Sequence, residues 1–179
     1  MTFITLTRIT GEKCVVNLDR VIAMYEESID DDKKGTAIYF TDQQTDILKE
    51  TLQNILLKIK HNKKFVVLTE MKGNKFIINM ENVATIADYR DGHSTLCFAN
   101  NKYIDVSENK DIILLKIKRN KLFLSLKQLN GRNIIVNMLQ VNKIMYEDSR
   151  NNSTVIFWGY YSCKEVVEDN FRKIISFLE

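Results

Sequence analysis

One short pattern occurs three times in the chain, and this repetition constrains the fold more than any other feature of the sequence. The copies are LTRITGEKCVVN from Leu6, LTEMKGNKFIIN from Leu68 and LKQLNGRNIIVN from Leu126. A later run also ends in phenylalanine in every copy (GTAIYF, HSTLCF, NSTVIF). Self-similarity at a fixed period predicts tandem structural units, which we place at residues 1–61, 62–120 and 121–179.

Within each unit the apolar pattern predicts short strands followed by one helix. In FITLTRI, Ile4 and Leu6 alternate with threonines, which is typical of a strand. A glycine in a polar turn then predicts a hairpin, because glycine readily adopts positive φ. Three further short strands are expected before a tail in which Leu52, Ile55 and Ile59 follow helical spacing.

The repeats predict an α+β fold. Each unit is expected to hold about four to five short antiparallel strands and one amphipathic helix. A unit of ~60 residues buries only ~60% of the surface of its unfolded chain, so single units are marginally stable. The joints IKHNKKF and IKRNKLF are short. We therefore expect the units to pack as a pseudo-threefold cluster or a linear array, with the helices making the contacts between units.

Composition points to a globular protein. The chain has 179 residues, 45% hydrophobic and 27% charged. We find neither a run of ~20 apolar residues nor a signal-like start. These features predict a cytoplasmic protein without membrane insertion. The net charge of +3 is too small to indicate nucleic-acid binding by itself.

The repeated hairpin and the helical tail resemble a known family. LTRITGEKCVVN together with DILKETLQNILLKI is similar to the small bacterial FlbD/SwrD-type proteins, single-unit polypeptides linked to flagellar and swarming function. The first unit matches best, and L-T-R is lost in the other two. The resemblance implies a non-enzymatic accessory or interaction protein of a motility or envelope system, with no catalytic residues to transfer.

A second, looser likeness concerns the middle of the chain. INMENVATIADYRDGHSTLCFANNKYIDVSENKDIILLKI looks like the strand-and-helix core of LytTR-type DNA-binding domains. In that class a β-rich fold presents basic loops to DNA. The basic C-terminal part that would read DNA has no counterpart in this sequence.

No residue pattern predicts catalysis, a cofactor or a metal site. His61 and His93 fall at non-equivalent places, without an acid or thiol at a suggestive spacing. The run Asp30 to Asp32 lacks the ligand pattern of a calcium loop. The cysteines stand singly in apolar runs, typical of small buried hydrophobic residues; they are Cys14, Cys97 and Cys163. We expect a non-enzyme.

The recurring glycines and asparagines predict structural turns. Each glycine lies six residues before its asparagine, and an Asn side chain can bond a backbone group two residues on. If the units closed into a ring, the asparagines could instead surround a central site. The residues are Gly11, Asn17, Gly73, Asn79, Gly131 and Asn137.

Basic residues cluster at both joints between units. One interpretation is that these cations keep the linkers solvated and interact favourably with the negative ends of the helix dipoles. The alternative is that they form a stripe that binds phosphates. The residues are Lys58, Lys60, Lys63 and Lys64 at the first joint, and Lys116, Lys118, Arg119 and Lys121 at the second.

One turn of the third unit is aromatic where the other units are polar. FWGYYS stands in place of FTDQQT and FANNKY. Because aromatic residues are enriched at protein interfaces, Trp158, Tyr160 and Tyr161 are candidate partner contacts; internal packing is the alternative. The sequence thus favours an adaptor with an unidentified protein partner and undetermined oligomeric state. The alternative function is a nucleic-acid-binding regulator that uses the basic joints.

Overall fold

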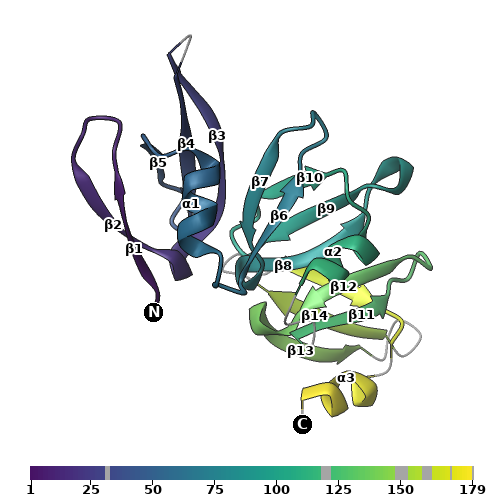
Figure 1. Ribbon diagram of the computed structural model, residues 1–179. Helices are drawn as coiled ribbons and strands as arrows, with labels where there is room; N and C mark the ends of the chain where they lie inside the picture. The colour runs from purple at the N-terminus through teal and green to yellow at the C-terminus, as the bar shows by residue number, and fades with distance from the viewer. Residues whose placement is uncertain (31–32, 118–121, 148–152, 159–162, 170, 179) are drawn as a thin grey trace. The chain divides into compact units, whose positions relative to one another are not determined.

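The computed structural model describes residues 1–30, 33–117, 122–147, 153–158, 163–169 and 171–178. They form antiparallel sheets and three α-helices, so the predicted α+β class is confirmed (Figure 1). The chain divides into two compact units, Met1–Asn82 with Leu115–Arg119, and Val83–Leu114 with Asn120–Glu179. In the described ranges, no helix combines the length and apolar character that crossing a bilayer requires.

The first unit contains a two-strand sheet, a five-strand sheet and a helix. The small sheet is the hairpin β1–β2, and the large sheet has the order β5-β4-β3-β7-β6. Its elements are β1 (Phe3–Thr7), β2 (Lys13–Asn17), the 3-10 helix η1 (Leu18–Arg20), β3 (Val21–Asp30), β4 (Lys33–Phe40), β5 (Thr45–Leu48), α1 (Leu52–Ile59), β6 (Phe65–Thr69), β7 (Lys75–Asn79) and η2 (Met80–Asn82).

Glycine closes the predicted hairpins as expected. Gly11 has φ of 100° and donates its N–H to the carbonyl of Arg8 at 2.9 Å. Gly73 has φ of 91° and makes the equivalent bond to Glu70 at 2.8 Å. These positive φ values are strained for residues that carry a Cβ, so the glycines set the reversal of the chain.

Strand pairing, rather than helix packing, links the first two predicted units. β7 pairs antiparallel with β3, with Ile77 opposite Met24 and Ile78 opposite Ala23. The first five-strand sheet therefore includes strands from residues 1–61 and from residues 62–120. The expectation that helices make the contacts overlooked this pairing, because apolar periodicity identifies a strand's faces but not its neighbour.

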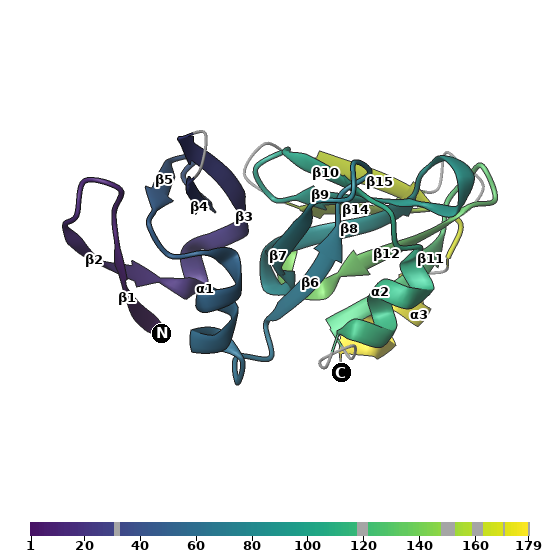
Figure 2. The same cartoon turned by 45° about the horizontal axis from the view of Figure 1, so that its top comes forward.

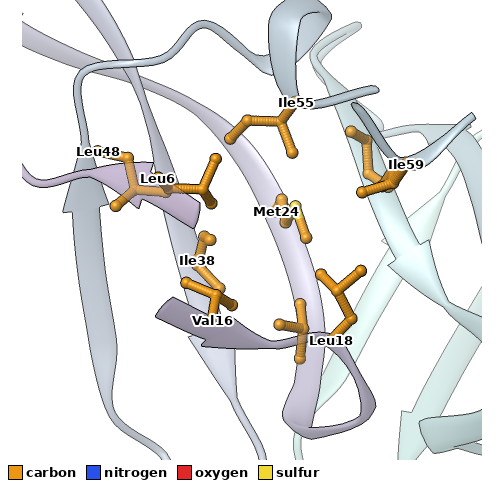
Figure 3. Close-up of a cluster of buried hydrophobic side chains, with 10 residues drawn as sticks. Leu6, Val16, Leu18, Met24, Ile38, Leu48, Ile55 and Ile59 are labelled. Carbon is orange, nitrogen blue, oxygen red and sulfur yellow. The ribbon is translucent and has the colours of Figure 1, made fainter. Parts of the chain in front are cut away.

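The core of the first unit gathers side chains from β1 to β5 and from α1 (Figure 3), together with Ile77 of the second hairpin. Leu6 and Val16 enter it from the first hairpin, while Ile77 enters it from the second. The helix contributes Ile55 and Ile59, as its spacing predicts. The second hairpin thus shares the core of the sheet that precedes it in the chain.

The second unit repeats this pairing and adds a further sheet (Figure 2). The five-strand sheet has the order β10-β9-β8-β12-β11, and the three-strand sheet has the order β13-β14-β15. The elements are β8 (Val83–Asp88), η3 (Arg90–Gly92), β9 (Ser94–Phe98), β10 (Tyr103–Val106), α2 (Lys110–Lys116), β11 (Phe123–Lys127), β12 (Asn133–Asn137), η5 (Met138–Gln140), β13 (Val141–Glu147), β14 (Ser153–Trp158), β15 (Cys163–Val167) and α3 (Phe171–Leu178). The last two residues of α2, Leu115 and Lys116, belong to the first compact unit.

Candidate functional site

The three repeated asparagines occupy equivalent turns. Their side-chain oxygens accept hydrogen bonds of 3.1 Å from the backbone N–H two residues on, at Asp19, Glu81 and Leu139. Asn79 and Asn137 are also buried and donate their side-chain amides to backbone carbonyl oxygens of the preceding repeat, one in η1 and one at the start of β8. The acceptors are Leu18 at 3.1 Å and Val83 at 2.7 Å. These contacts hold each hairpin against the sheet before it.

At the first basic joint, nearby carboxylates offset part of the positive charge. The Lys64 ammonium lies 2.9 Å from Asp19 and 2.7 Å from Glu81. The hydrogen bond from Lys64 lowers the pKa of Asp19. Burial acts to lower the pKa of Lys64, but the bonds to Glu81 and Asp19 outweigh it and raise that pKa. Lys64 is therefore held in a structural ion pair.

The other lysines of this joint differ in their surroundings. Lys58 donates to the carbonyl of Thr5 at 3.3 Å and lies 3.6 Å from Glu50. Lys60 and Lys63 are exposed. Lys63 and His61 line an open depression of about 520 Å³. Lys60 and Lys63 are thus the lysines of the first joint that are exposed and for which no carboxylate contact is described.

The second joint is described only at its start. Lys116 donates to the carbonyl of Val67 at 3.1 Å. Lys118, Arg119 and Lys121 lie outside the described residues. A phosphate-binding stripe over both joints remains a prediction.

Trp158 belongs to the hydrophobic core. It is 7% exposed and clusters with Ile156, Val167 and Ile174. This burial argues against the expected partner contact and agrees with the alternative of internal packing. Tyr160 and Tyr161 lie outside the described residues.

The described histidine, cysteine and acidic side chains are not gathered into a metal site. The described parts of the chain hold no group of three or more His, Cys, Asp or Glu side chains suited to a metal. His93 Nδ1 lies 3.0 Å from the carbonyl of Ser107, within its own unit. Asp31 and Asp32 are outside the described residues. The non-enzyme interpretation stays an expectation.

A different feature stands out at β13. Its residues align with β3 and β8, each of which pairs with a following hairpin, whereas β13 is an end strand of its sheet in the described structure. Met24 and Ile86 are fully buried in the paired strands, but their counterpart Ile144 is only half-buried. The next residue, Met145, is 41% exposed, and its counterparts Tyr25 and Ala87 are half-buried.

The last helix shows the same difference. Leu178 aligns with Ile59 of α1 and Ile117, both of which are buried, yet Leu178 is 52% exposed. Ile59 packs in the core that also includes Phe65 of the following hairpin. We call Ile144, Met145 and Leu178 the β13 edge. It can accept a strand through backbone hydrogen bonds and cover that strand's apolar side chains.

The sequence contains a signal for this edge that the hairpin pattern does not reveal. Asn142 and Lys143 stand where the first unit has Ile22 and Ala23, both buried. Polar residues at positions buried elsewhere mark a strand in a different environment. Lysine on an end strand also disfavours indiscriminate pairing.

The likeness to known proteins is structural. No protein-family model matches the chain, and no curated protein matches it. Among solved structures, the LytTr DNA-binding domain of a methyl-accepting/DNA response regulator from Bacillus cereus is similar, with TM-score 0.48 and 16% identity, over 66% of this chain and 98% of that one. That domain is of the LytTR type, the class to which the middle of this sequence bears the looser likeness. The FlbD/SwrD resemblance, with its motility or envelope role, stays a prediction.

Proposed function

We propose that the chain is a non-enzymatic binding protein that holds a protein partner by strand addition at the β13 edge. The observation that carries this proposal is that Ile144 is only half-buried and Leu178 is exposed, whereas the earlier counterparts of both residues are buried. Those earlier counterparts belong to arrangements in which a hairpin pairs with the sheet. The partner presents a hairpin or strand with alternating apolar side chains. Successive side chains of an added strand point to opposite faces of the sheet, so every second side chain can pack against the same face.

The chain's own hairpins show what such a ligand contributes. Ile77 of β7 is fully buried in the core it shares with β3, and Phe76 packs edge-on against Tyr25 with ring centroids 5.6 Å apart. Full burial of one such aliphatic side chain contributes about 1.5–3 kcal/mol. Loss of rotational and translational freedom opposes binding, so we expect moderate affinity.

The test uses a hairpin that this chain already pairs with a sheet. A labelled synthetic peptide with the sequence of Phe65–Asn79, FVVLTEMKGNKFIIN, is titrated with the full chain and followed by fluorescence anisotropy. We expect saturable binding that Met145→Glu weakens. Leu57→Glu is the matched control, because Leu57 is exposed on α1, which belongs to the other compact unit of the chain.

A second peptide tests the chemistry of recognition. Replacing Ile77 of the peptide by lysine removes the side chain that is fully buried in the chain's own pairing. We expect this peptide not to bind. Equal binding of both peptides, or a Met145→Glu chain that binds as well as the original, contradicts strand addition at this edge.

The nucleic-acid alternative rests on exposed Lys60 and Lys63 beside His61. Binding through phosphates weakens steeply with salt. Anisotropy of labelled duplex and single-stranded DNA across a salt series tests this, with a Lys60→Glu/Lys63→Glu variant. Lys72→Glu/Lys75→Glu is the control, because both of these lysines are exposed on the second hairpin.

We favour the protein partner over nucleic acid. The positive charge of Lys64, one of the basic residues of the first joint, is offset by two nearby carboxylates.

A further inference from the structure

The first hairpin presents a surface that complements the β13 edge. β2 is an end strand of its two-strand sheet in the described structure. Val15 is 68% exposed, although its counterparts Ile77 and Ile135 are fully buried. Phe3 is 53% exposed, whereas its counterpart Phe65 packs against the first core. The face that later hairpins bury against a preceding sheet is thus exposed on the first.

The two internal pairings define how this surface would dock. Met24 lies opposite Ile77 in one and Ile86 lies opposite Ile135 in the other, which are equivalent positions of the repeat. The flanking pairs also correspond. Continuing this register places Val15 opposite Ile144. Lys143 then lies opposite Val16, and Met145 opposite Cys14.

We propose that the first hairpin of one copy adds to the β13 edge of a second copy, so that chains associate head to tail. This inference rests on the proposed function, since it names the ligand of the same edge. A second copy is the occupant because one sequence carries both halves of an interface that it already makes twice internally, with one register. Val15 would occupy the place of Ile77, and Phe3 the place of Phe65.

Such an interface joins two different surfaces. After two copies pair, one copy still has a free β13 edge and the other still has a free first hairpin. Association therefore continues into a row or closes into a ring, depending on the rotation between copies. Lys143 does not prevent the pairing, because its long side chain can carry the ammonium past the strand to water.

Complementary variants test the proposal by sedimentation velocity over a range of protein concentrations. Val15→Glu blocks the first hairpin, and Met145→Glu blocks the β13 edge. We expect the unaltered chain to form dimers and larger species as concentration rises. Each variant alone should associate at least about 100-fold more weakly, because an unpartnered carboxylate is costly to bury. An equimolar mixture should form a dimer and nothing larger, through the one intact pair of surfaces.

The controls separate association from folding. Val15→Thr keeps a strand-forming residue, and Leu57→Glu places the same charge at an exposed position of α1. Circular dichroism should show all variants folded, and Leu57→Glu should associate like the unaltered chain. A chain that stays monomeric at every concentration overturns head-to-tail association; if the Phe65–Asn79 peptide still binds, the proposed function stands. A mixture that does not dimerise, while the unaltered chain does, also overturns it.

Discussion

The side-chain amide of Asn79 lies 3.1 Å from the carbonyl oxygen of Leu18, a residue 61 positions earlier, and both residues are buried. Its oxygen accepts from the N–H of Glu81. Asn79→Ala leaves both backbone groups without these partners, so we expect the free energy of unfolding to fall by about 2–4 kcal/mol. Urea denaturation followed by circular dichroism measures this loss.

Asn17 provides the matched comparison. It makes the bond to the N–H two residues on, but it is only half-buried. Asn17→Ala should cost about 0.5–2 kcal/mol, the usual value for a cap. An equal loss for the two variants would mean that the bond from Asn79 to Leu18 contributes little.

Acid should destabilise the first unit through Glu50. Its carboxylate accepts from the N–H of Thr7 at 3.0 and 3.1 Å and from the Thr7 hydroxyl at 3.2 Å. Burial acts to raise the pKa of Glu50, but these bonds and Lys58 outweigh it and lower that pKa below 4.5 in the folded chain. The unfolded state therefore binds the proton more readily, and stability falls as pH drops below about 4.5.

The contribution of Glu50 can be isolated by substitution. Glu50→Gln cannot ionise, so its free energy of unfolding should decline less than that of the unaltered chain as pH falls from neutral to about 3. The hydrogen bond from Lys64 also lowers the pKa of Asp19, so protonation of Asp19 should still reduce the stability of both proteins at low pH. Parallel pH curves for the two chains would exclude a role for Glu50.

Gly35 in β4 should not tolerate a side chain. A Cβ at this position would overlap the carbonyl oxygen of Leu48 and would lie 2.5 Å from Cδ1 of Ile29. We expect Gly35→Ala to cost about 3 kcal/mol, because backbone must shift. Gly73→Ala meets no neighbour and should cost about 1 kcal/mol, from its positive φ alone. Thermal unfolding of the two variants checks this order.

Lys143 should make the β13 edge selective. It is exposed where Ala23 and Thr85 are buried beneath a paired hairpin. Lys143→Ala removes a side chain that disfavours strand pairing, so the Phe65–Asn79 peptide should bind several-fold more tightly. Peptide anisotropy measures the change. Weaker binding to this variant would show that Lys143 contacts the ligand favourably.

Local structure could be predicted from the sequence, but strand partners could not. Alternating apolar residues and the turn at Gly11 predict the first hairpin, and the spacing of Ile55 and Ile59 predicts the buried face of α1. Pairing of β3 with β7 depends on residues more than 50 positions apart, which local periodicity does not encode. For Trp158 the sequence left a partner contact and internal packing open for a similar reason, since a predicted turn does not show which core lies beneath it.

Amide hydrogen exchange of the β13 segment tests strand addition at this edge most directly. Exchange is measured by mass spectrometry on Val15→Glu, the variant designed to stay monomeric, with and without the Phe65–Asn79 peptide. We expect residues 141–147 to exchange faster than the paired strands at 21–27 and 83–88, and to slow when the peptide is added. Exchange in β13 as slow as in those strands, or unchanged by saturating peptide, would contradict a strand-docking edge at β13.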